Sequence, residues 1–152
     1  MAGSAVEISH NGHEFSGAVN EIADRFGSAL PAMQIIGETV TESVQRNFEK
    51  GGRPSGWQPL SDATLAAKNG GGSILVGKGF AGGLLGSIHS EPEEHVVYVG
   101  TDKIYGAIHN FGGQAGRGMK VKIPAREYLM VQDEDAGEIV DLLQEFILTG
   151  QV

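Results

Sequence analysis

The sequence predicts an α+β fold in which a small, mainly antiparallel sheet packs against two N-terminal helices and one C-terminal helix, with long glycine-rich loops. Apolar residues recur at spacings of three and four in residues 15–30, 33–50 and 139–147, which is typical of amphipathic helices. Between them lie short segments that alternate apolar and polar residues or are rich in β-branched residues, which is typical of strands. Strands in the middle of the chain with helices on both sides indicate an α+β arrangement.

The N-terminal third is expected to form one strand and two helices. Residues 6–9 alternate apolar and polar side chains, as a half-buried strand does. The first helix covers residues 15–30, and Pro31 ends it or opens the second helix. The two glycines at 51–52 follow the second helix and supply a stop signal.

The later elements are shorter, apart from the last helix. Three kinds of signal define them: a serine that can cap a helix, runs that are β-rich or strictly alternating, and acidic residues at a helix N-terminus. In order, we expect a short helix over residues 61–68, a strand over 84–90, a turn over 91–94, a strand over 95–100, one or two helical turns over 104–111, a strand over 119–123 and a helix that begins near the acidic residues 133–135.

Length and composition exclude several classes of protein. A chain of 152 residues fits a single domain over residues 1–152. It has no cysteine, so disulfides and thiolate metal sites are excluded. No apolar run reaches the ~20 residues that a membrane helix needs, so no membrane partner is expected. The 11 basic and 19 acidic residues give a net charge of −8, which argues against a protein that neutralises nucleic-acid phosphates.

Glycine is over-represented, with 24 residues. Most of them lie in three stretches, at about residues 50–60, 69–86 and 112–118. Because glycine loses much backbone entropy on folding, we expect three flexible loops that become ordered against a partner.

Sequence patterns that resemble catalytic or binding motifs lack the context that those motifs need. Residues 77–82 match the dinucleotide pattern G-x-G-x-x-G, but no strand precedes them and no helix follows. His10 and His13 are a possible metal pair, yet a turn-forming Asn-Gly lies between them and no third ligand is evident. Ser87 is not part of a G-x-S-x-G elbow. We therefore expect no catalytic residue, no metal ligand and no cofactor.

Two segments indicate protein contacts instead. The only tryptophan, Trp57, lies in a loop of glycines and prolines, where a large aromatic is expected to pin the loop to a core or to a neighbouring subunit. Residues 105–113 combine an aromatic pair with His109 and a double glycine. Either they form a helical turn packed on the core with His109 bonded locally, or His109 and Phe111 face a subunit partner.

Four segments carry a resemblance to a known family. They are residues 56–61 together with Thr64, residues 99–101 together with Tyr105, residues 108–113, and residues 123–129. On these segments the chain resembles the phage virion morphogenesis family, from about residue 20 to its end. The chain departs from the family pattern at residues 75–77, where a longer glycine stretch follows, at Asn110 in place of glutamine, and at residues 127–128, where Glu-Tyr replaces Pro-Phe.

The resemblance implies a structural protein of the phage head–tail junction and not an enzyme. Such a protein completes or terminates the tail, or forms a neck ring, and enables the head to join. The implied partners are copies of the same chain in a ring, expected to be six-fold, together with the tail tube and the neck or connector proteins. DNA would pass through the ring without sequence-specific binding. The implied location is the neck or tail end of the virion, and the host cytoplasm during assembly. The expected interface residues are Trp57, Pro59, Leu60, Leu75, Phe80, Tyr105, His109, Phe111, Arg126 and Tyr128.

Two other functions remain open at the level of the sequence. One is a small metal-dependent enzyme that uses His109 with Tyr105 or Arg126. The other is a head-side adaptor that contacts DNA directly, for which strongly salt-dependent DNA binding would be the signature.

Overall fold

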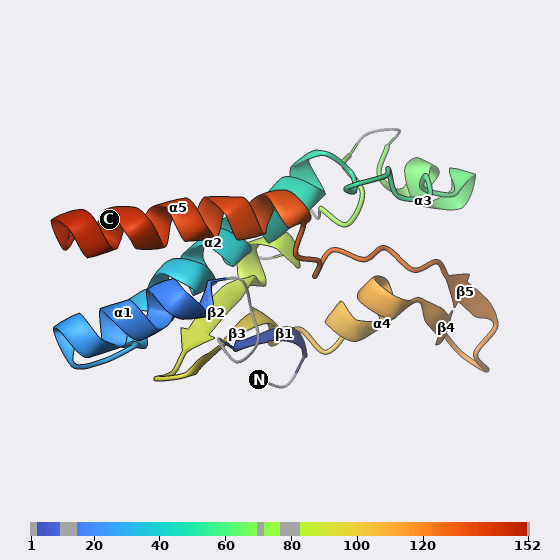
Figure 1. Ribbon diagram of the computed structural model, residues 1–152. Coiled ribbons are helices and arrows are strands. Elements are labelled where there is room, and N and C mark those ends of the chain that lie inside the picture. Colours follow the sequence, from blue (N-terminus) through green and yellow to red (C-terminus); the bar gives the residue numbers. More distant parts are fainter. Residues whose placement is uncertain (1–2, 10–14, 70–71, 77–82, 152) are drawn as a thin grey trace. The chain divides into compact units, whose positions relative to one another are not determined.

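The computed structural model describes residues 3–9, 15–69, 72–76 and 83–151 (Figure 1). Helices and small antiparallel sheets are mixed, so the predicted α+β class is confirmed. The elements are β1 (Ser4–Ser9), α1 (Ser16–Phe26), α2 (Leu30–Glu49), α3 (Asp62–Ala67), the 3-10 turn η2 (Leu85–Ser87), β2 (His89–Pro92), β3 (Val96–Thr101), α4 (Gly106–Phe111), β4 (Gly113–Ala115), β5 (Val121–Ile123) and α5 (Asp133–Thr149).

The chain folds into two compact units. Unit 1 consists of residues 1–4, 44–88 and 100–130, and unit 2 of residues 5–43, 89–99 and 131–152. The helix α2 contributes its first part to unit 2 and its last turns, from Val44, to unit 1. In the part of the chain that the structure describes, no helix combines the length and the apolar character that crossing a membrane requires.

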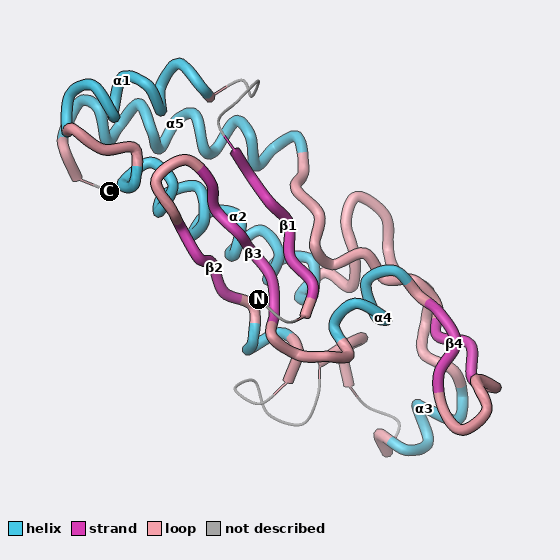
Figure 2. Tube along the Cα trace, turned by 90° about the horizontal axis from the view of Figure 1, so that it is seen from below, coloured by secondary structure: helices cyan, strands magenta, loops and turns pink. Residues whose placement is uncertain are grey.

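Unit 2 combines most of a three-stranded sheet, in the order β1-β3-β2, with α1, α5 and the first part of α2. A tight turn, in which the Glu93 amide donates to the Val96 carbonyl at 2.8 Å, joins β2 to β3, so this pair is antiparallel. Figure 2 shows the strands side by side with α2 behind them. The helix comes very close to the sheet at Gly37, where an added Cβ would lie 2.8 Å from Val97 Cγ2. Only glycine fits this approach.

The predicted apolar stripes form the core of unit 2. Val19 and Ile22 of α1, Ile36 and Val40 of α2 and Ile139 of α5 are among the fully buried side chains. Their spacing of three and four places them on one face of each helix, which explains why all three helices are found. The first is shorter than predicted, because it ends at Phe26 before Gly27, whose φ is 75°, and Leu30 already belongs to α2.

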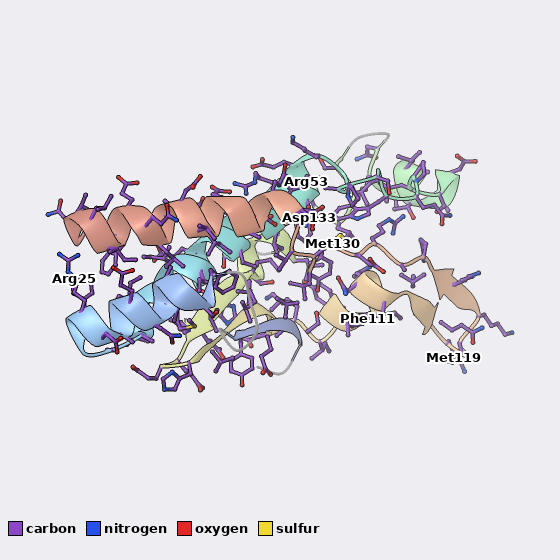
Figure 3. All side chains as sticks on the ribbon, in the orientation of Figure 1. Arg25, Arg53, Phe111, Met119, Met130 and Asp133 are labelled. Carbon is purple, nitrogen blue, oxygen red and sulfur yellow. The ribbon has the colours of Figure 1, made fainter. Side chains whose placement is uncertain are left out.

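Two further contacts join α1 to α5. Phe26 packs against Phe146 with 5.0 Å between ring centroids, and the Arg25 guanidinium donates to the Ile147 carbonyl (Figure 3).

At the start of α5, the Asp135 carboxylate accepts from the Gln132 amide at 2.6 Å and from Ser43 Oγ at 2.6 Å. This is a capping box, and it gives the acidic residues predicted at this N-terminus a structural role.

Unit 1 holds the end of α2, the short helices α3 and α4, the turn η2 and a two-stranded hairpin. The hairpin pairs β4 with β5 in antiparallel register, with Gly113 opposite Ile123 and Ala115 opposite Val121. The core of unit 1 includes the fully buried rings of Phe48 and Tyr128, whose centroids lie 5.2 Å apart.

Several predicted boundaries are wrong. The strand expected over residues 84–90 begins only at His89, because the preceding residues form η2. Leu84, Leu85 and Ile88 are all buried, a spacing that suits a helical turn, and Ser87 Oγ donates back to the Leu84 carbonyl at 2.7 Å. The turn expected over residues 91–94 falls at 93–95.

The glycines of residues 112–118 predict a loop, but residues 113–115 within this stretch form β4. At the preceding junction, Gly112 has a φ of 72°, a left-handed conformation that favours glycine. Glycine therefore marks the sharp turn between α4 and β4, and not a loop that extends through the whole segment.

Some predictions lie outside the described residues and stay predictions. They concern the dinucleotide-like pattern at 77–82, the interface residue Phe80, the turn between His10 and His13, and part of the expected 69–86 loop.

Candidate functional site

The segment after β5 is held in unit 1 by side-chain hydrogen bonds. Asn110 Oδ1 accepts from the amides of Tyr128 and Leu129, both at 3.0 Å. Asn47 Nδ2 donates to the Tyr128 carbonyl at 2.9 Å, and the Tyr128 hydroxyl pairs with Ser4 Oγ at 2.9 Å. Buried asparagines thus satisfy the polar backbone of a segment that has no sheet partner, as buried polar groups require.

Trp57 fixes the proline- and glycine-rich loop to the same core. Its half-buried ring meets Phe48 edge-on, with 5.6 Å between centroids. Its Nε1–H donates to the Glu127 carbonyl at 3.4 Å, and the Trp57 amide donates to the Gly51 carbonyl at 2.7 Å. Of the two anchoring sites expected for this tryptophan, the structure shows the one in the chain's own core.

Arg126 connects three of the four segments on which the family resemblance depends. Its Nε and Nη2 donate to the Gln58 carbonyl at 3.1 and 3.0 Å, and Nη2 also donates to the Pro59 carbonyl at 3.3 Å. Its own amide donates to the His109 carbonyl at 2.9 Å. The residue is 6% exposed, and burial lowers the pKa of its guanidinium. Among the described residues, no carboxylate pairs with it and no acceptor contacts Nη1.

His109 lies on α4 beside Tyr105, with the two rings edge-on at 6.0 Å. Its Nδ1 is buried and has no hydrogen-bond partner among the described residues. Burial, and then the positive charge of Arg126, lower the pKa of His109 below its ordinary value of 6.5. The imidazole is therefore neutral at pH 7. Of the two alternatives for His109, the locally hydrogen-bonded one is not found at Nδ1 among the described residues, and the partner-facing one stays a prediction.

These segments surround a pocket of about 640 Å³ within unit 1, a size typical of binding pockets. Six of the ten predicted interface residues line it. They are Pro59, Leu60, Leu75, Tyr105, His109 and Arg126.

The other predicted interface residues lie elsewhere. Trp57 supports the loop from the core side, and Tyr128 is fully buried. Phe111 is 72% exposed on α4 (Figure 3), and Phe80 lies outside the described residues.

The pocket is basic, which was not predicted from the sequence. Lys68, at the end of α3, and Lys122, on β5, line it with Arg126. Lys68 Nζ donates to the carbonyls of Ser73 and Val76, at 3.1 and 2.9 Å. No acidic residue is among the lining residues in the described part of the chain. The available signal was the group of four basic residues over 117–126, Arg117, Lys120, Lys122 and Arg126.

The pocket does not resemble a metal centre. Within residues 3–9 and 15–151 as far as they are described, no three histidine, aspartate or glutamate residues cluster to hold an ion. The residues of the metal-dependent alternative, His109, Tyr105 and Arg126, do line the same pocket. A permanent cation beside His109, however, opposes the binding of a second positive ion there.

Replacing Trp57 with alanine is expected to lower the free energy of unfolding by about 1.5–3 kcal/mol, because the ring covers Phe48 and is half-buried. Urea unfolding followed by far-UV circular dichroism measures this change. Trp57→Phe is the matched control, which keeps an aromatic ring against Phe48 and should lose only about 1 kcal/mol. Equal losses in the two variants would contradict a packing role for the indole.

Acid should destabilise the protein partly through His109. Because its folded-state pKa is lowered, the unfolded state binds more protons as the pH falls. The resulting contribution to stability is fully present above about pH 6.5, and is lost as the pH falls through the lowered folded-state pKa. Between pH 7.5 and 5, the Tm of His109→Gln should therefore fall less than that of the wild type. A parallel decrease would show that His109 does not contribute.

Comparison with known proteins identifies relatives over most of the chain. The phage virion morphogenesis family matches residues 11–147. The chain is 38% identical over 141 residues to the Mu-like prophage FluMu G protein 2 of Haemophilus influenzae. The aligned region covers 93% of this chain and 94% of that protein. It is 29% identical over 125 residues to the putative capsid assembly protein G of Escherichia phage Mu, and this aligned region covers 77% of each protein. No solved structure matches significantly.

Proposed function

The chain belongs to the phage virion morphogenesis family, and from this premise we propose that it is a structural protein of the head–tail junction. In this proposal it caps the completed tail and enables the head to join. Membership of the family supports a role in virion assembly, and one relative is named a putative capsid assembly protein. The position at the head–tail junction is the more specific part of the proposal.

One observation carries the proposal. Arg126, in the segment after β5, holds the Trp57 loop and α4 together. Its guanidinium donates to the carbonyls of Gln58 and Pro59, and its backbone amide donates to the carbonyl of His109. These are the segments that most resemble the family, and together they form the walls of one open pocket. The most specific sequence features thus build a recognition surface, and we infer that the protein binds other proteins and does not catalyse a reaction.

The proposed assembly is a ring of copies that matches the six-fold tail, in contact with the tail tube and the neck or connector proteins. Each pairwise interface can be modest, because ring closure adds avidity. The net charge of −8 supports a passage for DNA without retention, since an acidic surface repels phosphates. In the proposal the protein is found in the host cytoplasm during assembly and then at the virion neck.

The test is a phage from which the gene for this chain has been deleted. The proposal predicts filled heads and separate tails that do not join, and purified protein added to such a lysate should restore joined, infectious particles. Addition of a variant with the pocket disrupted, such as Lys122→Glu together with Lys68→Glu, should restore fewer. Absence of normal capsid shells would instead indicate a role in capsid assembly, and joined particles without the protein would contradict the proposal.

A further inference from the structure

The pocket of unit 1 is cationic although the chain as a whole is acidic. Lys68, Lys122 and Arg126 line it, and none of its described lining residues is acidic, whereas the chain carries a net charge of −8. Arg126 is almost completely buried and its Nε and Nη2 are bonded to carbonyls. Its Nη1 has no acceptor among the described residues and is not one of the fully buried atoms that lack a partner, so it stays accessible from the pocket. This donor is available to a ligand, and a carboxylate offers acceptors that an arginine fits.

The rest of the lining selects for more than an anion. Leu60, Leu75, Val76 and Ile123 form part of the wall, and all of them are half-buried. Such a wall gains free energy by covering an apolar side chain. A free phosphate would leave it uncovered, and a nucleic acid would be repelled by the net charge. The pocket therefore suits a protein segment that carries a carboxylate beside an apolar side chain.

Unit 2 presents such a segment on α5. Asp141, Glu145 and Leu148 are spaced by four and three residues, so they share one face of the helix. All three are exposed, Leu148 by 81%. The two carboxylates have no partner among the described residues. In the described part of unit 2, the other large apolar side chains that are exposed are Phe26, which packs on Phe146, and Val131, which is 41% exposed.

We propose that the pocket of one copy receives Glu145 and Leu148 of a second copy. The Glu145 carboxylate binds Arg126 Nη1 with Lys122 beside it, and Leu148 covers the apolar wall. The two surfaces are different parts of the chain, and we propose that they meet head to tail, in a heterologous contact of the kind that generates a closed ring when the rotation allows it. This inference rests on the proposed function, because it describes the contact between copies in the proposed ring.

Disulfide trapping tests the contact directly, because the chain has no cysteine. Lys122→Cys and Leu148→Cys are made in separate chains, mixed and oxidised, both as concentrated protein and in particles that contain both variants. The proposal predicts a covalent dimer in the mixture, several-fold above that of Lys122→Cys mixed with Glu38→Cys, an exposed control site on α2. With both substitutions in one chain, a ladder that ends at the ring size is expected. Yields equal to the control in protein and particles would overturn it.

Charge reversal provides the second measurement. Lys122→Glu and Glu145→Lys each place like charges at the contact and should weaken self-association about tenfold, while the combination restores an attractive pair. Both side chains are exposed, so the fold is preserved, whereas Arg126 is left intact because it holds the Trp57 loop. Two single losses without rescue in the double variant would contradict the pairing.

The two proposals fail in different ways. If the deleted phage requires the protein for head–tail joining but no trapped dimer forms, only the contact is wrong. If the trapped dimer forms but joined particles appear without the protein, the contact stands and the junction role is wrong.

Discussion

Replacing Tyr128 with alanine is expected to lower the free energy of unfolding by about 3–5 kcal/mol, the range for truncation of a buried aromatic. The ring is fully buried, packs on Phe48 at 5.2 Å and lies below the segment that carries Arg126. Its loss leaves a cavity that the flanking chain cannot fill, because Asn47 and Asn110 hold the backbone on both sides. Urea unfolding followed by circular dichroism measures the effect.

Tyr128→Phe is the matched control. It keeps the ring and removes only the hydrogen bond to Ser4 Oγ, so it should lose about 1 kcal/mol. Burial raises the pKa of Tyr128, although the bond to Ser4 opposes this, so the hydroxyl stays protonated well into alkaline conditions. A loss from Tyr128→Ala as small as that from Tyr128→Phe would show that the ring does not support the pocket.

The second large effect is expected for Asn110→Ala. The substitution removes the one acceptor shared by the amides of Tyr128 and Leu129. Each donor left without a partner costs about 1–3 kcal/mol, so a total of about 2–6 kcal/mol is expected for the two amides. Gln114→Ala, at an exposed position of β4, is the control and should change the free energy of unfolding by less than about 0.5 kcal/mol.

The consequence of Asn110→Ala should extend to binding. Because the segment that Asn110 holds leads into Arg126, the variant should also lose self-association under conditions in which it remains folded. If Asn110→Ala is as stable as Gln114→Ala, then water or another group satisfies the two amides, and this account of the segment is wrong.

Local patterns predicted the long helices well. The stripes that include Val19, Ile36 and Ile139 have the period of a helix, and these residues are buried. A period is a local property, so it survives whatever the tertiary contacts are. Residues 84–88 show the opposite case, because their apolar pattern is too short to distinguish a strand from a helical turn, and Ser87 decides for the turn.

The pocket could be predicted only in part. Aromatic and glycine-rich motifs pointed to Pro59, Tyr105 and His109, which do line it. The cationic set did not emerge, because Lys68 and Lys122 are more than fifty positions apart and meet only through tertiary folding. The same holds for Arg126, whose partners Gln58 and Pro59 are about seventy positions away. The family resemblance, by contrast, is confirmed over residues 11–147.

The most direct test of the central claim is an electron-microscopy map of the whole particle at a resolution that allows this chain to be placed. The account predicts several copies arranged as a ring between the tail tube and the connector, with α5 of each copy at the pocket of the next. Finding the chain only in the capsid shell, or in no part of the finished particle, would contradict it.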